Sequence, residues 1–198
     1  MVAHRIIFIR HGETDWNAEA RLQGQLDIPL NARGLAQASE AGKRALKILG
    51  PDGVRDSALH YVASPLDRTR HTMRLARAAM GLDPDIFETD PRLMELTFGE
   101  WEGLTWPEVQ ARSPQSANWR EGDKWNFVPP GGESYAMLEV RLKPWLEAIT
   151  GDSLVVSHGG VARVLMSMIA GLPQERAALA DIWQGRVLVF QERRFDWI

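Results

Sequence analysis

The sequence contains no cysteine. This absence excludes a disulfide framework, catalysis by a thiolate, and zinc or iron–sulfur sites with cysteine ligands. The sequence also has no uninterrupted apolar run of 18 residues, so no segment is predicted to cross a membrane. The first residues lead directly into a short apolar segment, without the longer apolar region and cleavage site of a signal peptide. We therefore expect a cytoplasmic protein.

An excess of positive charge is missing as well. The 23 lysines and arginines are outnumbered by 26 aspartates and glutamates, which gives a net charge of -3. Nothing in this balance favours bulk binding to nucleic acid or to an anionic membrane. The chain has 198 residues, of which 44% are hydrophobic, enough for one substantial core. We expect a single domain over residues 1–198, and the sequence leaves the oligomeric state open.

Short apolar segments alternate with segments of helical periodicity along most of the chain. Strands are predicted at residues 6–9, 59–63, 85–89, 154–156 and 186–191, and helices at 32–49, 65–80, 106–112, 135–149 and after Gly160. Ser64 and Pro65 are typical of a helix start. This alternation predicts an α/β fold, a three-layer α/β/α sandwich with a mainly parallel central sheet. Residues 93–132 are rich in Gly, Pro and Trp, and we expect an irregular insertion that covers the site.

Two predicted strands end in a histidine followed by glycine. The first runs into Arg10-His11-Gly12 and the later one into Ser157-His158-Gly159. Ligands of open α/β sheets bind beyond the carboxyl ends of the strands, so both imidazoles are expected in one site. Arg68 follows a third strand and belongs to the same edge. Arginines and helix N-termini at one crevice predict an anion site that suits a phosphate group.

The sequence has no Walker loop and no run of carboxylates that would hold a catalytic magnesium ion. We therefore expect side chains to neutralise the phosphate, and we predict no metal and no cofactor. A neutral imidazole beside such a site is able to attack phosphorus directly.

Several motifs, in a fixed order over almost the whole chain, resemble those of the histidine phosphatase superfamily, in the branch related to cofactor-dependent phosphoglycerate mutases. The matching blocks are Arg10-His11-Gly12-Glu13-Thr14 with Asn17, Arg21-Leu22-Gln23-Gly24, Asp27-Ile28-Pro29-Leu30, Ser64-Pro65-Leu66-Asp67-Arg68-Thr69, Leu93-Met94-Glu95, Phe98-Gly99-Glu100-Trp101-Glu102-Gly103, Pro130-Gly131-Gly132-Glu133-Ser134 and Ser157-His158-Gly159-Gly160. One block alone is a weak signal, and all of them together are a specific one.

The resemblance implies a role for each matching residue. His11 would be the nucleophile and would pass through a phosphohistidine, while Arg10, Arg68 and His158 would hold the phosphoryl oxygens. Glu95 would donate a proton to the leaving alcohol and then activate water. The remaining substrate-binding candidates are Asn17, Gln23, Gly24 and Gly159.

Simpler interpretations of some residues remain open. Asn17 is also a typical turn-capping residue, Gln23 and Gly24 also suit a loop that only needs its shape, and Ser134 suits a helix N-cap. Aromatic residues of the insertion belong either to the core or to a substrate pocket; they are Trp106, Trp119, Trp125 and Phe127.

Two features favour hydrolysis over phosphoryl transfer. Only 63 positions separate Glu95 from His158, whereas the glycolytic mutases that the chain resembles have a longer segment there. Those mutases also tend to have Asn where this chain has Gly160. We therefore predict a phosphomonoesterase that acts on a small phosphorylated metabolite. The alternatives are a mutase and a regulator that binds a phosphorylated ligand without turnover, although a pure binder has no need of His11 and Glu95.

Overall fold

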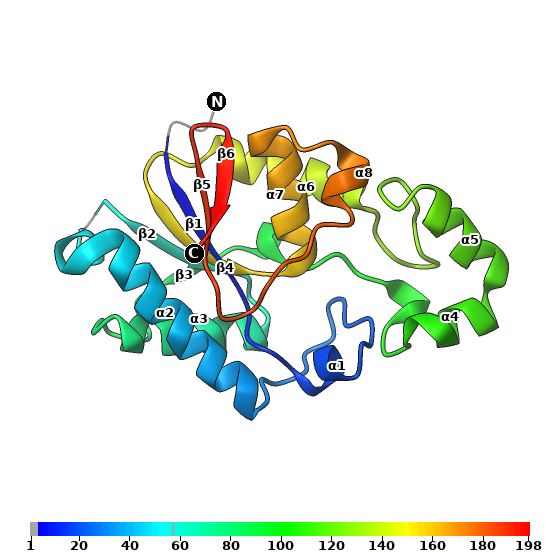
Figure 1. Ribbon diagram of the computed structural model, residues 1–198, viewed down its shortest axis with the longest axis horizontal. Helices are drawn as coiled ribbons and strands as arrows, with labels where there is room; N and C mark the ends of the chain where they lie inside the picture. Colours follow the sequence, from blue (N-terminus) through cyan, green and yellow to red (C-terminus); the bar gives the residue numbers. More distant parts are fainter. Residues whose placement is uncertain (1–3, 57) are drawn as a thin grey trace.

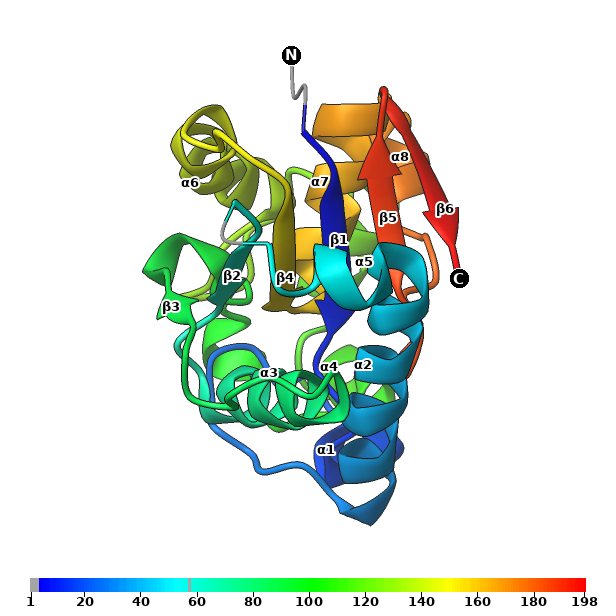
Figure 2. The same cartoon turned by 90° about the vertical axis from the view of Figure 1, so that its left-hand side faces the viewer.

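The computed structural model describes residues 4–56 and 58–198, and its centre is a sheet of six strands. The strand order is β3-β2-β4-β1-β5-β6. The bounds are β1 Ile6–Arg10, β2 His60–Ala63, β3 Glu88–Thr89, β4 Ser153–Ser157, β5 Leu188–Gln191 and β6 Arg194–Trp197. The first four strands are mutually parallel, while β5 and β6 add an antiparallel edge. The sheet is therefore mainly parallel, as predicted (Figure 2).

Helices cover both faces of the sheet. On one face, α2 (Ala32–Gly53) and α3 (Asp67–Ala79) pack against apolar side chains of β1 and β4, and on the other face α6 (Tyr135–Glu147) and α7 (Gly159–Ala170) do so. Figure 1 shows the sheet between these two pairs of helices. This arrangement confirms the three-layer α/β fold. It also explains why β1 and β4 read as continuous apolar runs, because both faces of each strand are buried.

The register between β1 and β4 places the two histidines side by side. Arg10 is paired with Ser157 at the last position of the ladder, and the His11 amide donates to the Ser157 carbonyl at 2.9 Å. Both chains therefore leave the sheet at the same level. The next residue on each strand is a histidine, and His158 is also the N-cap of α7.

The start of α3 differs from the prediction. The helix begins at Asp67 with Leu66 as its N-cap, rather than at Pro65 with Ser64 as the cap. The Leu66 side chain makes no capping hydrogen bond. Instead the amide of Asp67 donates to both carboxyl oxygens of Asp27 at 2.9 and 3.1 Å, so a distant loop supplies the negative charge that a helix N-terminus favours. Arg68 consequently lies in the first turn of the helix.

The last strand, β6, was not predicted from the sequence. The chain forms a hairpin after β5, with Glu192 and Arg193 at positive φ of 50° and 63° in the turn. Hairpin turns of this kind usually carry Asn-Gly, so the sequence before β6 lacks the signal by which the turn would be recognised.

The helix predicted to end at Gly50-Pro51 does break there, because Gly50 has φ 74° and ψ 165°, but helical residues continue to Gly53.

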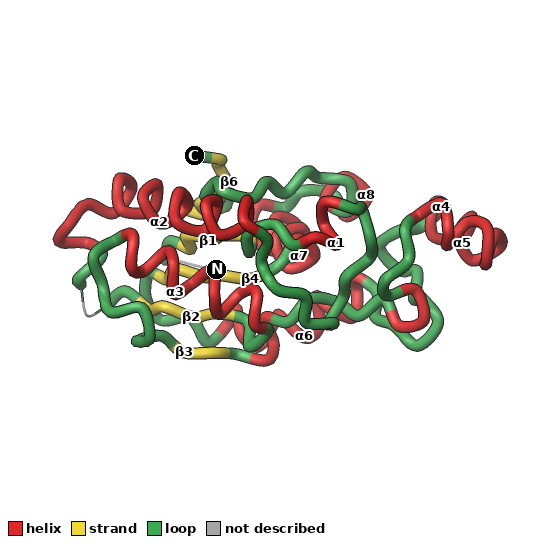
Figure 3. Tube along the Cα trace, turned by 90° about the horizontal axis from the view of Figure 1, so that it is seen from below, coloured by secondary structure: helices red, strands yellow, loops and turns green. Residues whose placement is uncertain are grey.

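The segment 93–132 is more regular than predicted. It contains α4 (Trp106–Arg112), as expected, and a second helix, α5 (Pro114–Gly122), that was not expected. Both lie at one end of the molecule (Figures 1 and 3). Only Ala117 of α5 is buried, so this helix lacks the apolar periodicity by which helices are recognised. Short elements complete the chain: α1 (Asp15–Ala18), α8 (Gln174–Ala177) and 3-10 turns at Pro91–Leu93 and Gly99–Trp101.

Within residues 4–56 and 58–198, no helix combines the length and the apolar character that a membrane crossing requires.

Candidate active site

The two histidines at the ends of β1 and β4 form the centre of the site. The ring centroids of His11 and His158 are 5.2 Å apart, and both side chains are buried. Burial lowers the pKa of each imidazole well below its ordinary value, and the positive charges of Arg68 and Arg10 lower it further. Both rings are therefore neutral near pH 7.

Hydrogen bonds define which ring nitrogens carry protons. His11 Nδ1 lies 2.8 Å from the carbonyl oxygen of Gly12, and a carbonyl only accepts, so Nδ1 carries the proton and Nε2 keeps a lone pair. His158 Nε2 lies 2.8 Å from the hydroxyl oxygen of Ser64, and its Nδ1 lies 3.4 Å from Nη2 of Arg68. Because a guanidinium only donates, His158 Nδ1 accepts and Nε2 donates to Ser64.

Arg68 is a buried cation held by backbone oxygens. Its Nη1 donates to the Leu26 carbonyl at 2.7 Å and its Nη2 to the Gly24 carbonyl at 2.6 Å, with Asp27 Oδ1 at 3.8 Å from Nη1. The side chain is 1% exposed, and burial lowers its pKa. These contacts fix the guanidinium against His158. Its Nε is buried without a partner among the described residues.

Arg10 supplies the second guanidinium. Its Nη1 donates to the Ile182 carbonyl at 2.7 Å, and its buried Nε has no partner in the described part of the chain. Burial lowers the pKa of Arg10 to about 10, and the charge of Arg163 lowers it as well. Both arginines therefore have a buried Nε–H donor without a partner, which an anion in the site is able to satisfy.

Glu95 lies at the N-terminus of α7. Its Oε2 accepts a hydrogen bond from the Gly160 amide at 3.0 Å, and its Oε1 accepts one from the Leu96 amide at 3.1 Å. Its backbone carbonyl accepts from the side chain of Gln25 at 2.9 Å. The glutamate is thus fixed at the same helix end that begins at His158. The structure brings together all five residues predicted to be catalytic: Arg10, His11, Arg68, Glu95 and His158.

Asn17 and Gln23 form a polar loop beside this centre. Asn17 Oδ1 accepts from the Thr14 amide at 3.2 Å while the Asn17 amide donates to Thr14 Oγ1, which is the capping box of α1. Asn17 Oδ1 also accepts from Gln184 Nε2 at 3.0 Å. The turn-capping interpretation of Asn17 therefore holds in this structure, while its predicted phosphate contact stays a prediction.

Gln23 is buried and accepts at Oε1 from Thr14 Oγ1 at 3.1 Å and from Asn17 Nδ2 at 3.4 Å. Its buried Nε2 has no partner among residues 4–56 and 58–198. Gly24 has φ 56°, and a side chain there would meet Glu102, so this position does shape the loop. The Gly24 carbonyl also anchors Arg68. Substrate contact by Gln23 and Gly24 remains a prediction.

Gly159 lies where two guanidinium groups converge. A Cβ at this glycine would lie 3.5 Å from Arg163 Nη1 and 3.7 Å from Arg10 Nε. Sequence reasoning missed Arg163, which is four residues beyond Gly159 and therefore on the same face of α7. It also missed the contact of Ser64 with His158, although Ser64 directly follows β2 and so shares the edge of the other strand ends.

The aromatic residues of the insertion lie in three different settings. Trp106 and Trp125 line a cavity near α8, and Trp119 is largely exposed. Phe127 stacks on Trp101 with ring centroids 5.4 Å apart, within a small apolar cluster. Ser134 is the N-cap of α6, as predicted, and its hydroxyl accepts from the Met137 amide.

Among the residues that the structure describes, no group of three or more His, Asp or Glu side chains is arranged to hold a metal ion. The positive charge beside the two histidines comes from the guanidinium groups of Arg10 and Arg68.

One edge of the sheet thus holds a buried imidazole with a lone pair, a second imidazole, two arginines and a carboxyl group, an arrangement whose chemistry suits a phosphoryl group. The model of the histidine phosphatase superfamily (branch 1) matches residues 6–196 of the chain. The chain therefore belongs to this superfamily.

Among curated relatives, the chain is similar to a protein named probable phosphoglycerate mutase GpmB of Escherichia fergusonii. The two are 39% identical over 178 aligned positions, and the match covers 85% of this chain and 76% of the relative. The protein of the same name from Salmonella choleraesuis is 36% identical over the same lengths.

Among solved structures, the chain is similar to a putative alpha-ribazole-5'-P phosphatase from Escherichia coli. The TM-score is 0.79 at 25% identity, covering 99% of this chain and 95% of the other. A mycobacterial glucosyl-3-phosphoglycerate phosphatase gives a TM-score of 0.77 at 28% identity, covering 94% and 89%. The relatives' names thus include both mutases and phosphatases.

Proposed function

We propose that the chain is a phosphomonoesterase that hydrolyses a small phosphorylated metabolite through a phosphohistidine at His11. The observation that carries this proposal is the state of the His11 ring. Its Nδ1–H is held by the Gly12 carbonyl, and burial together with Arg68 keeps the pKa low, so Nε2 is a neutral nucleophile near pH 7. A nucleophile in this state needs no separate base.

The reaction has two displacements at phosphorus. His11 Nε2 attacks, the bond from phosphorus to the ester oxygen breaks, and Glu95 gives a proton to the departing alkoxide. Water then attacks the phosphohistidine, the phosphorus–nitrogen bond breaks, and Glu95 takes a proton from that water. Inorganic phosphate leaves, and His11 returns to its neutral form.

Charge stabilisation is the main task in such a transfer, because the transition state spreads negative charge over the equatorial oxygens. Arg10 and Arg68 converge on the two rings, and each has a buried Nε–H without a partner in the described chain. Without a bound anion His158 is neutral, because burial and the positive charge of Arg68 lower its pKa. A bound phosphate would offset that charge and favour protonation of His158 at Nδ1, in place of the hydrogen bond that Nδ1 accepts from Arg68, and the new Nδ1–H would then donate to the phosphoryl group.

The space at Gly160 supports hydrolysis over transfer. A Cβ at this position would overlap Glu95 Oε1 and lie 2.8 Å from Leu96 Cδ2. Glu95 therefore occupies room that a side chain would need, and the Asn associated with the mutases would require the Glu95 carboxyl group to move. The second candidate is phosphoryl transfer of the mutase type, which the name and 39% identity of a curated relative favour. A mutase returns the phosphoryl group to a second hydroxyl, whereas a phosphatase releases inorganic phosphate.

A rapid-quench experiment with phosphorus-labelled p-nitrophenyl phosphate tests the proposal. The wild type should carry acid-labile label and release inorganic phosphate, and His11→Ala should do neither. His60→Ala is a control, because His60 is exposed at the start of β2. Retention of a tenth of the wild-type kcat by His11→Ala would refute the nucleophile assignment. Incubation with phosphoglycerates separates the two candidates, since isomerisation without phosphate release would identify a mutase.

A further inference from the structure

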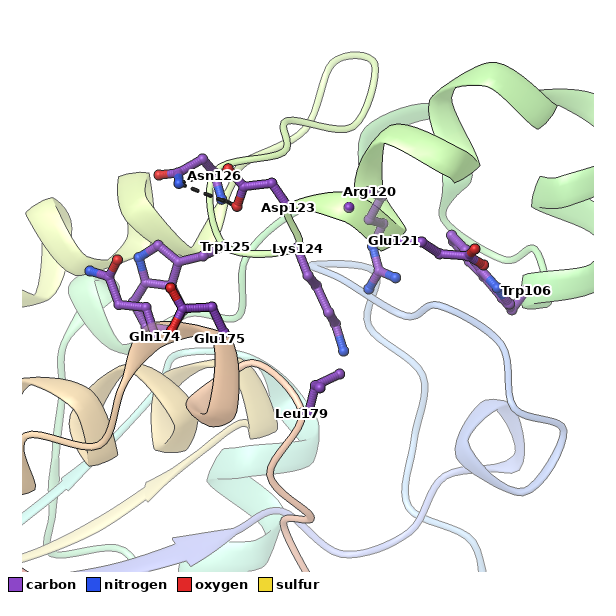
Figure 4. Close-up of a pocket in the computed structure, with 11 residues that line it drawn as sticks. Trp106, Arg120, Glu121, Asp123, Lys124, Trp125, Asn126, Gln174, Glu175 and Leu179 are labelled. Carbon is purple, nitrogen blue, oxygen red and sulfur yellow. Dashed lines mark hydrogen bonds between the residues drawn. The ribbon is translucent and has the colours of Figure 1, made fainter.

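A cavity of about 550 Å³ opens between the insertion and α8, outside the two-histidine centre. Its walls come from α4, from the end of α5 with the loop after it, and from α8 with the residues just beyond (Figure 4). Trp106, Trp125 and Leu179 provide apolar surface, while Arg120 and Lys124 provide positive charge. This mixture of a few charged groups and apolar walls is typical of a ligand pocket.

The two cations of this cavity point to a common place. In Figure 4 the side chains of Arg120 and Lys124 both run from the α5 end towards Leu179. The Arg120 guanidinium lies 4.7 Å from the centroid of the Trp106 ring, which supports one face of the guanidinium and leaves its edge available. Glu121 lies on the Trp106 side and Glu175 beside Trp125, away from the Lys124 ammonium.

No carboxylate within the described residues forms an ion pair with Arg120, Lys124 or Arg163. Burial lowers the pKa of Lys124 to about 8, and the positive charges of Arg120 and Arg163 lower it as well. Burial is also the main cause of the lowered pKa of Arg120. The cations repel one another, and a bound anion would relieve that repulsion.

Arg163 and Tyr135 connect this cavity with the phosphate site. Arg163 Nη1 and Arg10 Nε converge on Gly159, as described above, and Arg163 Nη1 donates to the Tyr135 hydroxyl at 3.4 Å. The Tyr135 ring stacks on the Trp125 ring of the cavity wall, with centroids 5.4 Å apart. Neighbouring side chains, namely Arg163, Tyr135 and Trp125, therefore link Arg10 to the wall of this cavity.

We infer that this cavity receives the leaving-group part of the substrate, and that this part carries a second anionic group bound by Lys124 and Arg120. The inference rests on the proposed function, because the first anionic group is the scissile phosphate at His11. A carboxylate and a second phosphate share the required chemistry, since both accept bidentate hydrogen bonds from a guanidinium. A simple alkyl phosphate leaves the two cations without a partner.

Matched substrates test this inference. We suggest ω-phosphonooxy carboxylates with two to six carbons, the corresponding primary amides, and alkane bisphosphates of the same lengths. At pH 7 the best carboxylate or bisphosphate should have a kcat/KM about 10- to 100-fold above its neutral partner, the usual scale of a hydrogen bond to a charged group. The carboxylate and bisphosphate arms identify which anion the cavity prefers.

Substitutions of Lys124 connect the preference with this cavity. Lys124→Met should reduce the ratio of kcat/KM for the anionic and neutral substrates about tenfold or more. Lys143→Met is the matched control, because Lys143 is exposed on α6 and does not line the cavity. This control should leave the ratio unchanged.

The pH dependence of the ratio distinguishes charge recognition from a structural role. The charged groups around Lys124 are Arg120, Glu121, Asp123, Glu175 and, from α7, Arg163. Lys124 is protonated below about pH 8, so the wild-type preference should be present at pH 7 and fall as the pH rises to 9.5. Lys124→Arg should keep more of its preference over that range, since the ordinary pKa of a guanidinium lies well above that of an ammonium group.

Two failures are distinguishable. If p-nitrophenyl phosphate gives no phosphoenzyme, the proposed function itself is wrong. If the phosphoenzyme forms but no carboxylate or bisphosphate is preferred over its neutral partner, the inference about this cavity is overturned. A preference that survives Lys124→Met unchanged overturns it as well.

Discussion

Adding one methyl group at Gly160 should displace the carboxyl group of Glu95, the proposed general acid, while its covalent structure stays the same. In Gly160→Ala the new Cβ would overlap Glu95 Oε1 and lie 2.8 Å from Leu96 Cδ2. The hydrogen bond from the Gly160 amide to Glu95 Oε2, now 3.0 Å, would be strained or lost. Since Gly160 lies in the first turn of α7, the glutamate has to move rather than the helix.

The expected loss follows from that displacement. Misplacement of a reacting group by about 1 Å costs roughly 10²-fold, and general acid catalysis contributes about 10²–10⁴-fold in total. Gly160→Ala should therefore lower kcat/KM for alkyl phosphates by about 10²-fold. Release of p-nitrophenolate in a single turnover should fall much less, because this leaving group needs little protonation. Single-turnover kinetics with the two substrates measure the difference.

Two controls isolate the effect. Gly53→Ala places a methyl at the end of α2 against Leu49 Cβ at 3.4 Å, an ordinary contact, and should leave both rates unchanged. Glu95→Gln alone should lose alkyl phosphate hydrolysis by about 10²–10⁴-fold, and adding Gly160→Ala to it should cost little more, because both changes act on one group. Equal losses for both leaving groups, or additive losses in the double variant, would refute the role assigned to Glu95.

Two further predictions concern metals and pH. Activity should survive EDTA, because Arg10 and Arg68 supply the positive charge; loss with chelator and rescue by magnesium or zinc would contradict this. The pKa values of His11 and His158 are depressed in the folded state, so the unfolded chain binds more protons below its histidine pKa of about 6.5. The free energy of unfolding should therefore fall as the pH drops from 7 to 5.5, by up to about 1.4 kcal/mol per pH unit for each histidine. Urea titrations at these pH values measure the change. If the free energy of unfolding does not fall, the two rings are not held neutral in the folded state.

The position of the two histidines and of Arg68 was predictable because it depends on local sequence. β1 and β4 are continuous apolar runs, and each ends at a basic or polar residue followed by histidine and glycine. The parallel register alone then brings His11 beside His158. The same reasoning identified Arg68, which lies near the end of β2.

Contacts between distant segments were not predictable. Asp27 caps α3 across 40 positions, so the helix starts at Asp67 although Ser64 and Pro65 have the better start signal. The Ser64 hydroxyl is used by His158 instead, 94 positions away. Propensity describes what a residue prefers locally, and at this site a tertiary hydrogen bond outweighed it.

The two-histidine centre and the cavity near α8 differ in origin, and under the two proposals this difference would separate the reaction from its specificity. Strand ends and the N-terminus of α7 hold the proposed nucleophile, the two arginines and Glu95, to which we assign the chemistry at phosphorus. The cavity near α8 is built from helices with little apolar periodicity and from a charge cluster that includes Arg120, Lys124 and Arg163. Changes in residues 93–132 are therefore expected to alter which alcohol leaves, while the phosphohistidine step stays the same.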